Sequence, residues 1–150
     1  MDFSEHFQTL VMVSNKVDGL WQMYIGVHLG IFWLLFFMRR PLLAIERFIA
    51  LIAYTFFSAI NGKAMIDTYA LLDNLRTDLL ANFPEAIARV PDTAALMQSV
   101  NYGDRMPLIL ISHGLAWAFV VLTLAFRNQM IKAYQRQFPG HAEPARAAAE

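Results

Sequence analysis

Two uncharged stretches of sequence restrict this chain more than any other feature. Twenty consecutive residues between Asp18 and Arg39 carry no charge, and neither do the twenty-one residues between Arg105 and Arg127, counting histidine as neutral. At about 1.5 Å per helical residue, each stretch spans roughly 30 Å, which is the thickness of bilayer hydrocarbon. We therefore expect two transmembrane helices, over about 19–38 and 106–126.

A third span is expected over about 42–62, with charged residues at one end. Its charge-free part begins at Phe48 and covers only about 22 Å, so Glu46 and Arg47 are expected near the edge of the hydrocarbon. Arg47 can extend its charge outward, whereas Glu46 needs a partner. The composition is 57% hydrophobic and 16% charged, which is unlike an average soluble protein. The sequence predicts an all-α integral membrane protein, with one three-span domain over 1–138.

The distribution of basic residues predicts the orientation of the spans. One side would hold the Arg39–Arg40 connection and the C-terminus, with seven basic and three acidic residues, and the other side would hold five basic and nine acidic residues. Basic residues mark the cytoplasmic side. The N-terminus MDFSEHFQ carries acids where a signal peptide needs basic residues, so the first span is expected to be retained. We expect a bacterial-type inner (plasma) membrane protein with its N-terminus outside and its C-terminus in the cytoplasm.

The segments outside the spans also show helical periodicity. Phe3, Phe7 and Leu10 recur at helical spacing, which predicts a short amphipathic helix on the outer surface that the cluster Ser14–Lys16 would end. The second span is expected to continue as a helix beyond Gly62.

Short helices are expected to follow it and to build a small helical extracytoplasmic cap over about 63–105. Pro91 is expected to end one of these helices, and Asp92 or Thr93 is expected to start the next. Asp73 and Arg76 are one turn apart and are expected to pair. The third span is expected to emerge as a helix that Pro139 stops, and the tail 139–150 is expected to be disordered in the cytoplasm.

The spans carry polar side chains that lipid cannot satisfy. Counted from the outer end of each span, His28 lies about 15 Å deep and His113 about 10 Å deep. Hydrocarbon has no hydrogen-bonding groups, so such side chains should contact one another or a neighbouring subunit. The expected intramembrane polar cluster is Tyr24, His28, Tyr54, Thr55, Ser58, Ser112 and His113.

The first span also contains a GxxxG motif, formed by Gly26 and Gly30. This motif lets another helix approach closely. His28 is two residues from each glycine and should project from nearly the opposite face. The helix is therefore expected to have two occupied faces, which favours oligomerisation or membership of a larger complex. Ordinary packing within the chain is the alternative.

These features predict a non-catalytic membrane subunit that packs with other membrane helices in a homo- or hetero-oligomeric complex. A first alternative is an oligomeric ion or proton channel that uses His28 in the membrane and the charge pair Glu46–Arg47 at the inner mouth. A second alternative is a haem b or quinone-binding subunit with His28 and His113 as cofactor-binding residues. Their depths differ by about 5 Å, which helix tilt can absorb.

Other classes of function lack the residues that they need. The chain has no cysteine, which excludes disulfides, iron–sulfur clusters and thiolate ligands. HExxH, GxSxG and phosphate-loop motifs are missing, so no enzyme is expected. No metal site is expected, because His6 and His141 would lie on opposite sides of the membrane. The net charge is zero, so the expected partners are the lipid bilayer and other membrane helices, not nucleic acid.

Overall fold

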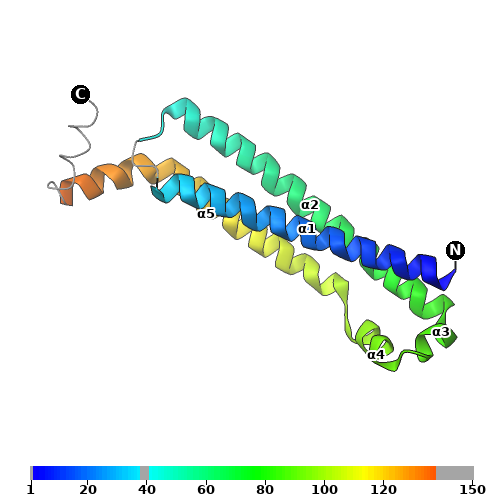
Figure 1. Cartoon of the computed structure of the whole chain (residues 1–150). Helices are drawn as coiled ribbons and strands as arrows, with labels where there is room; N and C mark the ends of the chain where they lie inside the picture. The colour runs from blue at the N-terminus through cyan, green and yellow to red at the C-terminus, as the bar shows by residue number, and fades with distance from the viewer. Residues whose placement is uncertain (1, 38–40, 138–150) are drawn as a thin grey trace.

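The computed structural model describes residues 2–37 and 41–137, and within these ranges every regular element is a helix. Three long helices run along the molecule (Figure 1). Three shorter helices connect the second long helix to the third. In chain order the elements are α1 (Phe3–Phe37), α2 (Ala44–Asn82), α3 (Pro84–Ala88), α4 (Pro91–Ser99), the 3₁₀-helix η1 (Tyr102–Asp104) and α5 (Arg105–Gln137).

The three long helices are each long and apolar enough to cross a membrane. This confirms the predicted all-α fold with three helices that could cross a membrane, which is consistent with a multi-pass membrane protein. The described part of the chain leaves out Arg39, Arg40 and the tail 139–150, so the predictions for the first connection and the tail lie outside it. The predicted stop at Pro139 lies outside it as well.

One expectation at the N-terminus is wrong. The structure has no break at Ser14–Lys16, because α1 runs continuously from Phe3 to Phe37. Val13 and Val17, one turn apart, are buried against Leu72 of α2. Serine and asparagine disfavour a helix interior only weakly, and neither proline nor glycine interrupts this turn. Tertiary packing therefore keeps the helix intact.

The second helix continues well beyond Gly62, as predicted, and ends at Asn82. Pro84 is the first residue of α3, and Pro91 is the first residue of α4. The expectation that Pro91 ends one helix and that Asp92 or Thr93 starts the next is wrong. Proline suits the first helical position, because its φ is preset and its missing N–H would be unpaired there anyway. Pro91 therefore starts a helix where it was expected to stop one.

Helix α2 is the central element, since it packs along both α1 and α5, which contact each other much less. Two apolar clusters, Val13–Val17–Leu72 and Leu79–Ile87–Met97, lie toward the α3–α4 end. A third cluster contains Leu35, Leu42, Tyr54, Val120 and Leu124. Figure 1 shows the N-terminus, α3 and α4 at one end of the molecule and the last turns of α5 at the other.

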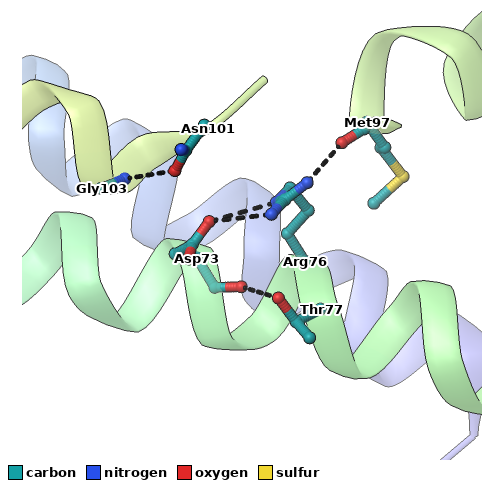
Figure 2. A network of polar contacts seen from close by, with 6 residues as sticks. All are labelled: Asp73, Arg76, Thr77, Met97, Asn101 and Gly103. Carbon is teal, nitrogen blue, oxygen red and sulfur yellow. Dashed lines mark hydrogen bonds and ion pairs between the residues drawn. The ribbon is translucent and has the colours of Figure 1, made fainter. Parts of the chain in front are cut away.

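Arg76 attaches the short helices to α2 (Figure 2). Its guanidinium lies 3.1 Å from Oδ1 of Asp73, which confirms the predicted pair. Its Nη1 also donates to the carbonyl oxygen of Met97 at 2.9 Å. Met97 is in the last turn of α4, where carbonyl groups lack helical donors. The side chain of Asn101 accepts from the N–H of Gly103 at 3.0 Å and shapes the turn into α5.

Candidate functional site

The candidate site is a group of polar side chains where α1, α2 and α5 meet. We call it the polar core and define it as Tyr24, His28, Tyr54, Asn61 and His113. All but Asn61 were predicted from the sequence. The three helices bring these residues together because each presents its polar groups at the same level, away from lipid.

His28 joins α1 to α2. Its Nδ1 lies 2.6 Å from the carbonyl oxygen of Tyr24, one turn earlier, and its Nε2 lies 2.6 Å from the hydroxyl of Tyr54. A carbonyl oxygen can only accept, so Nδ1 carries the proton and Nε2 accepts from the tyrosine. The buried ring is therefore satisfied in its neutral form.

Tyr24 lies between the two histidines. The centroid of its ring is 4.1 Å from that of His28 and 4.3 Å from that of His113. Its hydroxyl donates to the carbonyl oxygen of Ser112 at 3.1 Å. Tyr24 thus joins α1 to α5 and keeps the two imidazole rings apart.

His113 connects α5 to α2. Its Nδ1 lies 3.0 Å from the carbonyl oxygen of Ile109, and its Nε2 lies 3.0 Å from Oδ1 of Asn61. Both oxygens only accept, so this arrangement fits a ring with two N–H groups. A neutral ring with its proton on Nε2 keeps the bond to Asn61, and its Nδ1 then lies 3.4 Å from the hydroxyl of Ser112, which can donate to it. Gly62 makes the close approach possible, because a Cβ there would lie 3.2 Å from Cδ2 of His113.

Asn61 is the polar-core residue that the sequence analysis missed. Its amide also donates to the carbonyl oxygen of Leu20 at 3.4 Å, so it contacts α1 as well as α5. Helical spacing would have predicted it, because Asn61 follows Tyr54 by seven residues and Ser58 by three, which places all three on one face of a helix. Its position at the expected end of the span hid this relation.

Within the described part of the chain, Thr55 and Ser58 make no contact with the polar-core side chains through hydrogen bonds but line a groove of about 610 Å³ between α2 and α5. His113 of the polar core also lines this groove. Trp117 bridges the two helices there, and its Nε1 donates to Oγ1 of Thr55 at 3.0 Å. The hydroxyl of Ser112, another predicted member, donates to the carbonyl oxygen of Ile109 within its own helix at 3.0 Å.

Glu46 and Arg47 lie at the beginning of α2. The carboxylate of Glu46 accepts a hydrogen bond from the N–H of Leu43 at 2.9 Å. A carboxylate in the first turn also interacts favourably with the helix dipole. At the same end of the bundle, Arg127 is buried and its Nε donates to the carbonyl oxygen of Leu35 at 3.2 Å. The sequence analysis had not singled out Arg127.

The GxxxG face of α1 has no partner within the described part of the chain. A Cβ placed on Gly26 or on Gly30 would meet no atom within 4 Å. Among the described residues, no other helix packs closely on this motif. His28 is buried on the other side of the helix, so α1 has one face packed within the chain and one glycine face that is open.

Cofactor binding at the two histidines would require rearrangement. A bis-histidine haem needs both Nε2 atoms directed at one iron, but one faces Tyr54 and the other faces Asn61. Within residues 2–37 and 41–137, no three histidine or acidic side chains are grouped so that they could hold a metal ion.

Neither a family model, nor a curated protein, nor a solved structure matches this chain. Its function is therefore argued from the geometry of its own residues. Chemically, the polar core supplies hydrogen bonds and ring contacts that tie three helices together.

Proposed function

We propose that the protein is a non-catalytic subunit of a homo- or hetero-oligomeric membrane complex, and that a partner helix packs on the Gly26–Gly30 face of α1. The observation that carries this proposal is the contrast within α1. Tyr24 and His28 find their partners inside the chain, whereas the two glycines face open space.

The glycine face has the spacing of a helix–helix seam. Gly19, Met23, Gly26, Gly30 and Trp33 follow one another at alternating intervals of four and three residues, and all five are exposed. This is the seven-residue repeat of packed helices. Glycines let two backbones approach closely enough for extensive van der Waals contact, which is the main attraction between helices in lipid.

Exposed apolar side chains alone do not point to a partner, because lipid covers them in a membrane protein. Glycine differs, since it presents almost no side-chain surface to an acyl chain. A helix that leaves glycines toward lipid loses packing that another helix can supply. Gly114 of α5 is also open, but it is a single glycine, whereas Gly26 and Gly30 are two open glycines one turn apart on one helix.

We infer the orientation from the same charge distribution that the sequence shows. Seven basic residues would lie on the side of the C-terminus, which makes that side cytoplasmic. The first turns of α1, the outer part of α2, α3 and α4 would then form the extracytoplasmic cap of a plasma-membrane protein. The chain lacks cysteine, so single cysteines introduced at Ser4 and Lys132 report the two sides to an impermeant thiol reagent. We expect labelling from outside at Ser4 only, and the reverse pattern would overturn the orientation.

Disulfide cross-linking in native membranes tests the interface. Gly26→Cys places a thiol on the glycine face, and Leu115→Cys is a matched control. Leu115 is 68% exposed, and its depth is similar because Tyr24 of α1 is level with Ser112 of α5. We expect a cross-linked product with Gly26→Cys and none with Leu115→Cys. Equal cross-linking at the two positions would contradict the proposal, and no cross-linking at Gly26 would exclude the homo-oligomer. A single introduced cysteine can form a disulfide with the same cysteine of a second copy of this chain, so this experiment detects homo-oligomers. A hetero-complex is tested with a photoreactive amino acid at position 26.

A proton-conducting oligomer is the second candidate, and one observation favours it. His113 faces two acceptor oxygens and therefore suits a ring that gains a second proton. The role would fall on His113, since His28 is satisfied in its neutral form. Proton flux into liposomes would then be lost with His113→Leu and kept with His28→Leu. Equal flux in wild type, both variants and empty liposomes would remove this candidate.

A further inference from the structure

The groove between α2 and α5 lies away from the glycine face of α1 and is bordered by one polar-core residue, His113. Its volume of about 610 Å³ lies within the usual range for small-molecule sites. Small residues open it on both sides, namely Ala59 on α2 and Gly114 on α5. A Cβ on Gly114 would meet no atom within 4 Å, so the space beside this glycine is unoccupied by the described chain.

The chemistry of the groove changes along its length. At one end, Lys63 and Asp67 form an ion pair with 75% and 60% of their side chains exposed. One to two turns deeper is Ser58, which is only 7% exposed and has no hydrogen-bond partner among the described residues. Beyond Ser58 the walls are mainly apolar, and Trp117 lies against them.

These positions match the parts of a phospholipid. Lys63 is at the end of the expected span, which is the level of lipid headgroups. Ser58 is five residues deeper, or about 7.5 Å along the helix axis, where the ester groups and the start of the acyl chains lie. The ion pair presents one positive and one negative charge, which complements a headgroup with a phosphate and an ammonium group.

We propose that this groove binds one zwitterionic phospholipid with a primary amine in its headgroup. Lys63 contacts the phosphate, Asp67 contacts the ammonium group and the hydroxyl of Ser58 donates to an ester carbonyl. One acyl chain follows Gly114 toward Trp117. The lipid would fill the space between α2 and α5 and satisfy the hydroxyl that the chain leaves without a partner.

Native mass spectrometry of the detergent-purified full chain tests the proposal, with added phosphatidylethanolamine and phosphatidylglycerol of the same acyl chains. We expect one phosphatidylethanolamine to remain bound to wild type. Gly114→Leu fills the groove and should remove it, whereas Gly26→Leu, an equally open helical glycine on α1, should not. Lys63→Gln should weaken retention about tenfold, which is the effect of losing one charge-assisted hydrogen bond.

Three outcomes would overturn the proposal. One is equal retention of lipid by Gly114→Leu and Gly26→Leu, which would mean that the lipid binds outside the groove, on the apolar surface of the helices. Another is equal retention of the two headgroups. The third is a photo-cross-link from position 114 to another protein, which would make the groove a helix-packing site. Ala59→Leu fills the groove from the α2 side and replaces Gly114→Leu if circular dichroism shows that the latter is unfolded.

Discussion

The two faces of α1 meet different surroundings although they belong to one helix. On one face, His28 and Leu35 are buried against neighbouring helices, and Tyr24 donates to α5. On the other face, Gly26 and Gly30 have no neighbour within 4 Å of a Cβ. Polar side chains in lipid need hydrogen-bond partners within the folded chain, because an unpaired polar group is costly there. Small residues carry no such cost, so they can remain exposed until a second chain packs on them. The faces should therefore respond differently to substitution.

The largest expected difference separates two equivalent changes of glycine to leucine. Gly62→Leu should lower the free energy of unfolding by about 3 kcal/mol, because the new side chain must displace His113. In the isolated chain, without a partner helix, Gly26→Leu should change it by less than about 0.5 kcal/mol, since its Cβ enters open space. Unfolding in mixed micelles, followed by tryptophan fluorescence, measures both. Similar losses in the two variants would contradict the contrast between the faces.

The pair formed by His28 and Tyr54 should show energetic coupling. Each of His28→Leu and Tyr54→Phe removes the same hydrogen bond, so each should cost about 1 kcal/mol, and the double variant should cost less than their sum. The four-member cycle in the same unfolding assay gives the coupling energy. Strictly additive losses would mean that this contact does not hold α1 against α2.

Asn61→Leu should destabilise the fold by about 1 kcal/mol, because it removes the contacts to His113 and to Leu20 together. Gln22→Leu is the control, since it removes an exposed amide from α1. The control should leave the unfolding midpoint unchanged. If both variants shift the midpoint equally, the effect comes from the added apolar side chain and not from the lost hydrogen bonds of Asn61.

The smallest effect is expected at the edge of the groove. Trp117→Phe keeps an aromatic ring but removes the hydrogen bond to Thr55. Because this hydrogen bond is exposed, the free energy of unfolding should fall by about 0.5 kcal/mol or less. Trp33→Phe, on the exposed glycine face of α1, serves as the comparison in the isolated chain. A loss at Trp117 as large as that at Asn61 would extend the polar core to the groove.

Much of the polar core was predictable from single helices. Tyr24 and His28 are one turn apart, and hydrocarbon has no partner for either, so an inward contact follows from their positions alone. The identity of the contact did not follow. His28 pairs with Tyr54 and His113 with Asn61, because the register between helices depends on how all their side chains fit at once.

The sequence by itself determined the number of spans, the continuation of α2 and the pair between Asp73 and Arg76. These depend on the length of charge-free stretches and on contacts within one helix, which physical chemistry relates directly to residue order. Tertiary structure decided that α1 continues through Ser14–Lys16, that Thr55 and Ser58 line a groove, and that Gly26 and Gly30 stay open. Each of these depends on what a neighbouring helix presents, and no periodicity within one helix contains that information.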